Sequence, residues 1–173
     1  LPDRITVRYV EFPYSDYAAD SAATEEESQE YYNERMDDFT ELVAVTNETP
    51  AATNEPSSRL QRTTLPYEKV RDKIMTLVAE EKAREKALDV ATQMVLTLEP
   101  DREGHAPTFE EAAAKFGRTI KSVGPFARHE PVSSVSAGPA FNEAAFRLTQ
   151  RLEERFSDPV SGNEAALVLY LAE

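Results

Sequence analysis

The chain has 173 residues, of which 40% are hydrophobic, and this length suffices for one domain with its own core or for one domain with an appendage. Its formal net charge of −13 argues against nucleic acid or an anionic lipid surface as a partner, because both require a basic face. Cysteine is absent, which excludes thiol catalysis, disulfides and thiolate metal sites.

The first predicted element is a strand over residues 5–12. The run ITVRYVEF alternates in polarity and is rich in β-branched and aromatic residues. Pro13 follows, and a proline either ends a strand or confines it to the edge of a sheet.

A helix is predicted next, over residues 25–38. Thr24 and Glu27 form a capping box, in which each side chain accepts a hydrogen bond from the backbone N–H of the other residue. Three side chains share one stripe of this helix and are expected in the core, namely Tyr32, Met36 and Phe39.

Residues 41–63 are predicted to form a mobile loop. They are rich in threonine, asparagine, proline, serine and alanine, and they show little periodicity. Such a segment has too little apolar content to offset its ordering entropy, ~1–2 kcal/mol per residue for the backbone alone.

The longest predicted helix opens at Pro66 and runs to about Leu98, roughly 50 Å at 1.5 Å per residue. Its apolar residues recur at helical spacing, at Val70, Ile74, Leu77, Leu88, Ala91, Val95 and Leu98. A second stripe of small residues comprises Ala79, Ala83, Ala87 and Ala91. We expect this stripe to pack against the sheet or against the helix at residues 25–38, because small side chains let another backbone approach.

Residues 107–123 carry the next local signals. Thr108 and Glu111 form a second capping box, which predicts a helix from Phe109 onward. Residues 118–123 are rich in β-branched residues and predict a strand that stops at Gly124-Pro125.

The chain then predicts one short helix and two strands. Pro139 can open the helix, in which one face is shared by Phe141, Ala144, Ala145 and Leu148. Val160 and residues 165–171 are predicted strands joined by a turn around Gly162-Asn163. Since residues 165–171 are apolar at consecutive positions, we expect a central strand that is covered on both faces.

Four pieces of residues 107–173 resemble, in their order and spacing, the second half of a parvulin-type (PpiC-like) prolyl isomerase domain. They are TFEEAAAKFG, GPFAR, PAFNEAAFRL and FSDPVSG before a closing apolar strand. The resemblance implies an α+β, FKBP-like fold with a small mixed sheet of about four strands and packed helices, in which residues 5–12 pair with residues 165–171. It also implies a single domain over residues 1–173, with a helix-plus-loop excursion at 18–64, the long helix at 65–98 and the parvulin-like second half at 107–173.

The helix near the start of the chain carries a second resemblance. Residues 24–39, TEEESQEYYNERMDDF, are similar to a segment of bacterial SurA- and PpiD-type folding factors. In PpiD-like relatives an isomerase domain is inserted after this helix, where this chain has only the polar residues 41–63. The resemblance therefore implies a scaffold domain without its inserted isomerase.

Parvulins act on the prolyl amide with two histidines, and a methionine and a phenylalanine line the proline pocket. The resemblance places Tyr9 and Leu167 at the histidine positions and Ala137 at the methionine position, while Phe141 matches the phenylalanine. We therefore expect no catalytic residue, no metal ligand and no cofactor. The substrate-binding residues that the resemblance implies are Tyr9, Phe126, Ala137, Phe141 and Leu167.

This reading predicts a catalytically silent domain of an envelope folding factor that binds unfolded or proline-containing polypeptide segments. An active prolyl isomerase with an altered site and a structural or dimerisation domain are the alternatives, and a homodimer is left open. His105 and His129 lie in predicted loops outside the motifs and are expected to be solvated.

The resemblance also implies a periplasmic or cell-envelope location. No apolar run approaches a membrane span, so direct membrane insertion of this segment is not expected. The sequence opens in a strand-like run without a signal-peptide pattern. We therefore expect a piece of a longer protein that is exported or anchored in a membrane.

Overall fold

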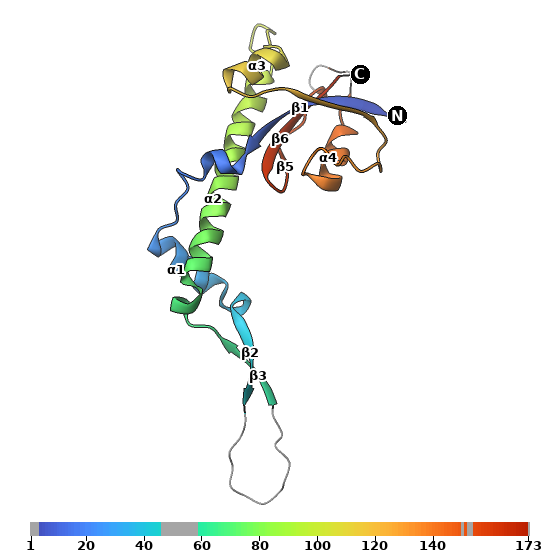
Figure 1. The fold of residues 1–173 in the computed structure, drawn as a ribbon. Helices are drawn as coiled ribbons and strands as arrows, with labels where there is room; N and C mark the ends of the chain where they lie inside the picture. Colours follow the sequence, from blue (N-terminus) through green and yellow to red (C-terminus); the bar gives the residue numbers. More distant parts are fainter. Residues whose placement is uncertain (1–3, 46–58, 150, 152–153, 173) are drawn as a thin grey trace, which may run out of the picture. The chain divides into compact units, whose positions relative to one another are not determined.

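The computed structural model describes residues 4–45, 59–149, 151 and 154–172. Contacts divide the chain into two units, one formed by Leu1–Ser21 with Glu80–Glu173 and the other by Ala22–Ala79. The smaller unit contains most of the excursion predicted at residues 18–64. The long helix α2 (Tyr67–Leu98) begins in the smaller unit and continues into the larger one (Figure 1).

A four-stranded antiparallel sheet in the order β4–β1–β6–β5 forms the centre of the larger unit. The strands are β1 (Ile5–Pro13), β4 (Lys121–Phe126), β5 (Val160–Ser161) and β6 (Ala165–Leu171). β1 and β6 lie side by side in Figure 1 and pair from Val7 opposite Leu171 to Pro13 opposite Ala165. The predicted return of the first strand to the last is therefore confirmed. The prediction of a mixed sheet is wrong, because all three strand pairings are antiparallel.

Both faces of β6 are covered, as its continuous apolar run predicts. Residues 166–169 are all buried. Because side chains alternate along a strand, Leu167 joins a hydrophobic cluster with β4 and α4 (Gly138–Ala145), whereas Val168 joins a cluster with α2 and α3 (Phe109–Lys115).

The start of α3 follows the predicted capping box. The backbone N–H of Glu111 donates to Thr108 Oγ1 at 3.2 Å, and the N–H of Thr108 donates to Glu111 Oε2 at 2.8 Å. The Glu111 carboxylate accepts hydrogen bonds from the backbone N–H and from the hydroxyl of Thr108, and these two bonds hold the pKa of Glu111 below its ordinary value, with the backbone bond as the main cause. The acceptor carboxylate is thereby favoured in its ionised form.

β4 differs from the predicted strand at residues 118–123, because it begins at Lys121 and passes through Gly124 to Phe126. Gly124 has φ +129°, and a Cβ atom there would lie 2.6 Å from the carbonyl oxygen of Ile5. The glycine therefore allows β4 to approach β1 where their register is irregular, and it does not end the strand.

Asn142 of α4 ties this helix to the loop that follows β4. Its Nδ2 atom lies 2.8–3.3 Å from three backbone carbonyl oxygens, those of Ala127, Arg128 and Glu130. The Asn142 side chain is buried, so these bonds satisfy a polar group that burial would otherwise penalise.

Part of the alanine stripe of α2 packs against the sheet, which is one of the two surfaces predicted for it. Ala87 and Ala91 are fully buried in one cluster with side chains of β1 and β6. Two leucines of the predicted apolar stripe, Leu77 and Leu88, are only half-buried. Among the described helices, none is both long enough and apolar enough to cross a membrane.

The smaller unit has a core of its own, built by α1 (Glu25–Glu34) and the first turns of α2. Phe39 packs there with three side chains of α2, namely Val70, Ile74 and Val78. The predicted helix at residues 25–38 is too long, because Arg35 leaves the helical region and a 3₁₀ turn, Met36–Asp38, follows. Met36 is 46% exposed, so its predicted place in the core is wrong.

The ends of the predicted loop at residues 41–63 are strands. β2 (Thr40–Val45) and β3 (Arg59–Thr64) form an antiparallel pair from Thr40 opposite Thr64 to Val45 opposite Arg59. The loop prediction is therefore wrong at both ends, and residues 46–58 lie outside the described residues. Valine and threonine favour extended backbone, and the ladder supplies order that composition alone does not reveal.

Candidate functional site

The five residues that the sequence predicts for substrate binding come together in one buried cluster. They belong to β1, β4, α4, the residue before α4, and β6. Their exposed fractions are small: Tyr9 3%, Phe126 4%, Ala137 8%, Phe141 0% and Leu167 2%. The cluster is therefore part of the hydrophobic core and offers almost no surface to a ligand in this structure.

Aromatic rings fill the centre of this cluster. The ring of Tyr9 meets that of Phe141 nearly at right angles, with centroids 5.6 Å apart. Phe126 lies 5.8 Å from Phe141 on another side. Edge-on and tilted contacts at these distances are the favourable geometries for aromatic pairs, so the rings hold one another in place.

The hydroxyl of Tyr9 is the one polar side-chain group among the five. Burial raises the pKa of Tyr9, the negative charge of Glu11 raises it further, and Lys121 opposes both effects. The phenol is therefore protonated at neutral pH and can act as a hydrogen-bond donor, but not as a base.

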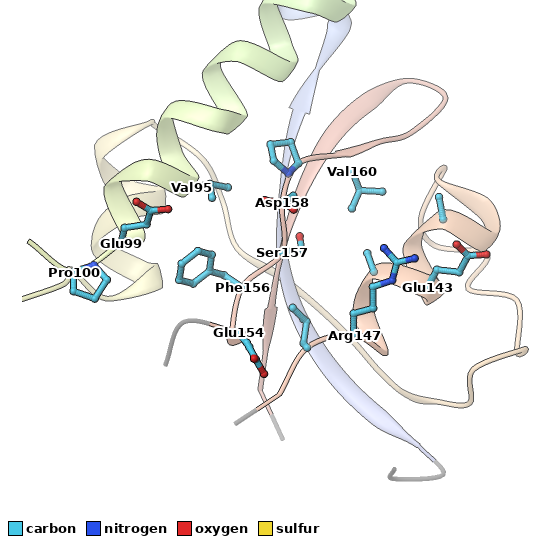
Figure 2. Close-up of a pocket in the computed structure, with 14 residues that line it drawn as sticks. Val95, Glu99, Pro100, Glu143, Arg147, Glu154, Phe156, Ser157, Asp158 and Val160 are labelled. Atoms are coloured by element: carbon cyan, nitrogen blue, oxygen red, sulfur yellow. The ribbon is translucent and has the colours of Figure 1, made fainter. Parts of the chain in front are cut away.

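A groove of about 780 Å³ lies elsewhere in the larger unit, along the chain segment that leads into β5 (Figure 2). One wall is formed by Val95 of α2 and by Glu99, which directly follows this helix. The other wall is formed by Glu143 of α4 and by Arg147, which lies in the turn after this helix. Phe156 lies between the walls. The volume falls in the range typical of ligand sites.

The groove combines an apolar lining with charged side chains. The apolar residues are Val95, Pro100, Ala140, Ala144, Leu148, Phe156, Pro159 and Val160. The charged residues are Glu99, Glu143, Arg147, Glu154 and Asp158. The lining therefore carries four carboxylates and one guanidinium group. The lining can bury apolar side chains of a ligand, and its net charge favours cationic groups.

Part of this negative charge is compensated within the protein. Glu154 accepts a 2.6 Å hydrogen bond from the Thr149 hydroxyl and lies 3.9 Å from Arg151. In the part of the chain that the structure describes, no ion pair engages Glu99, Glu143 or Asp158. These three carboxylates therefore define the charge of the groove.

The floor of the groove is an open edge of the sheet. Phe156 stands opposite Tyr170, while the N–H of Ser157 donates to the Leu169 carbonyl at 2.9 Å and the Arg155 carbonyl accepts from Leu171 at 2.8 Å. In an antiparallel ladder the residue between two bonded positions turns its N–H and C=O away from the neighbouring strand. The peptide groups of Phe156 therefore face away from β6.

The sequence did not indicate this groove, although part of its signal is present in α4. Ala140, Glu143 and Ala144 recur at the i+3/i+4 spacing of one helix face, and Arg147 follows in the turn after the helix. The prediction placed Ala144 and Leu148 on the core face with Phe141. In the structure they are half-buried, pack on the core cluster and also line the groove.

The two histidines are solvated, as predicted. The His105 side chain is 79% exposed, with Nδ1 3.8 Å from carboxylate oxygens of Asp101 and Glu103, and His129 is exposed. The described residues contain no group of three or more His, Cys, Asp or Glu side chains that is arranged to hold a metal ion.

No protein-family model, no curated protein and no solved structure matches the chain.

Proposed function

We propose that the chain is a catalytically silent, parvulin-like polypeptide-binding domain of a bacterial envelope folding factor of the PpiD or SurA type. It binds unfolded or partly folded chains without isomerising their prolyl bonds. The groove between α2 and α4 is the binding surface of this proposal.

The arrangement of the larger unit supports the parvulin-like part of the proposal. The resemblance requires the first strand to pair with the last, and β1 pairs with β6 over seven positions. α3, β4, α4, β5 and β6 follow one another in the order of the parvulin-like sequence pieces. Other α+β folds also pair distant strands, so this support concerns the architecture only.

The proposed lack of isomerase activity rests on one observation. The residues at the positions that the resemblance assigns to the parvulin active site are buried. Leu167 and Ala137 have no polar side-chain group, and the ring of Tyr9 is buried against that of Phe141. Stabilising a twisted amide needs positioned polar groups, and losing one such group commonly costs 10²–10³ in rate. Several of these groups are replaced here.

A paired measurement tests the proposal. We expect no prolyl isomerase activity on proline tetrapeptides by NMR exchange, with an active parvulin assayed in parallel as the control. We also expect the chain to bind a permanently unfolded polypeptide in fluorescence anisotropy, and not its folded form. A kcat/KM above ~10⁴ M⁻¹s⁻¹, the lower end of ordinary enzymes, would contradict the proposed lack of isomerase activity. Equal binding of the unfolded and the folded polypeptide would contradict the proposed selection of unfolded chains.

A second candidate, a dimerisation domain, rests on the ribbon of β2 and β3. Leu42 is 63% exposed and Leu60 is 68% exposed, and the pairing places both on one face of the ribbon. An isolated two-stranded ribbon is marginal in water unless another surface covers it. Light scattering after size exclusion tests this candidate, and a monomer at all concentrations would exclude it.

A further inference from the structure

We propose that the groove between α2 and α4 selects extended polypeptide segments in which lysine or arginine alternates with apolar residues. This inference rests on the proposed function, because it names the class of client that the same surface would take. The argument combines the groove's charge, its apolar lining and its open sheet edge.

The first step is the distribution of charge. Glu99 lies on one wall, Glu143 on the other, and Asp158 between them (Figure 2). Carboxylates around a concave, partly apolar surface focus a negative potential, which raises the local concentration of cations. One guanidinium, that of Arg147, opposes the four carboxylates of the lining.

The end of α2 adds to this potential. The helix has 32 residues and ends at Leu98, directly before Glu99 and Pro100 of the groove wall. The C-terminus of a helix carries a partial negative charge from its unpaired carbonyl groups, and cations are favoured there. This contribution is independent of the acidic side chains.

The second step identifies the cation as part of a polypeptide. The described residues contain no group of three or more side chains that could hold a metal ion, and the groove's carboxylates come from separate segments, represented by Glu99, Glu143 and Asp158. Between them lie apolar side chains such as Val95, Leu148 and Phe156. A lysine or arginine places its aliphatic stem on such a surface while its charged end reaches a carboxylate.

The third step is the backbone. The N–H and C=O of Phe156 face away from β6, so an extended chain can form main-chain hydrogen bonds at this edge. Pro159, which has no N–H, interrupts the edge a few residues later. The ligand therefore pairs over a short register, and its side chains determine selection.

Three peptides of equal length test the inference with the full chain. They share their apolar residues and carry lysine, glutamine or glutamate at the alternate positions. We expect the lysine peptide to bind at least about tenfold more tightly than the glutamine peptide, and the glutamate peptide not to bind. We also expect the preference to shrink between 50 mM and 500 mM salt, roughly from weak to strong screening.

Matched variants locate the effect. The triple variant Glu99→Gln, Glu143→Gln and Asp158→Asn removes three of the four groove carboxylates and should weaken lysine-peptide binding about tenfold. Its control removes three exposed carboxylates of α2 that do not line the groove, by Glu80→Gln, Glu85→Gln and Asp89→Asn. Both sets change exposed side chains, and unchanged thermal unfolding verifies that both variants fold.

The outcomes separate the two proposals. If the lysine and glutamine peptides bind equally, or if both triple variants weaken binding equally, the charge selection is wrong while polypeptide binding stands. If neither the peptides nor an unfolded polypeptide binds, the proposed function fails as well. If spermidine displaces the lysine peptide at stoichiometric concentration, the site recognises a small polyamine and the inference is overturned.

Discussion

Replacing Phe141 with alanine tests whether the position that the parvulin resemblance assigns to a proline pocket is a core position. The ring is fully buried and contacts the rings of Tyr9 and Phe126. Phe→Ala substitutions in cores cost about 3–5 kcal/mol, and each aromatic pair adds about 0.5–1.5 kcal/mol beyond area burial. We therefore expect a loss of about 4–5 kcal/mol, in the upper part of the range.

Urea unfolding followed by circular dichroism measures this loss directly. For a chain of this length, the expected change corresponds to a decrease in Tm of roughly 8–20 °C. Leu96→Ala is the control, because Leu96 lies on the same larger unit but is 59% exposed. It should change stability by no more than about 0.5 kcal/mol. Phe141→Leu provides a milder variant in case the alanine variant does not fold.

A loss below about 1 kcal/mol for Phe141→Ala would refute the reasoning. The ring would then contribute little to packing, as expected of a side chain that lines an open pocket. In that case a ligand could enter beside Tyr9, and the assignment of the cluster of Tyr9, Phe126 and Phe141 to the core would be wrong. A large loss of stability with unchanged polypeptide binding by the folded Leu variant would support a core role separate from the groove.

Three further predictions concern hydrogen bonds. Asn142→Ala removes the buried donor to three backbone carbonyl oxygens and should cost about 1–3 kcal/mol in urea unfolding, whereas no loss would mean that water replaces the amide. Thr108→Ala removes the cap of α3 and should cost about 1 kcal/mol, with Thr108→Ser restoring most of it. Hydrogen bonds from Arg71 hold the pKa of Glu25 below its ordinary value of 4.5, so the stability it adds is full above that pH and is lost as pH falls through the lowered pKa. Glu25→Gln should therefore lower the urea midpoint more at pH 7 than at pH 3, and an equal gap at both pH values would contradict this.

Local signals were sufficient to predict much of the larger unit. Thr108 with Glu111 located the start of α3, because a capping box satisfies specific N–H groups and leaves little ambiguity. The consecutive apolar residues of β6 indicated a strand buried on both faces, and that strand is central. The turn around Gly162-Asn163 implies an antiparallel pair of β5 and β6. The antiparallel direction of β1 with β4 and with β6 was not predictable, because direction depends on how the intervening chain returns.

The composition of residues 41–63 predicted a loop, but strand pairing orders both ends of this segment. Residues at both ends of the predicted loop look polar and aperiodic, yet β2 and β3 form a ladder from Thr40 opposite Thr64. Met36 has helical spacing with Tyr32, but Arg35 leaves the helical region and exposes it. Neither outcome can be derived from one segment, since each depends on where its partner lies.

The groove could not be predicted from the sequence, because it also depends on which distant segments come together. Its charged residues come from three separated segments, represented by Glu99, Glu143 and Asp158, and no spacing along the chain links them. The parvulin resemblance points to Tyr9 and Phe141, which the fold buries. A buried polar group is costly unless it is hydrogen-bonded, so an apolar cluster at these positions favours stability. The proposed recognition therefore requires an exposed surface, and the groove offers an apolar lining, carboxylates and the outward-facing peptide groups of Phe156 together.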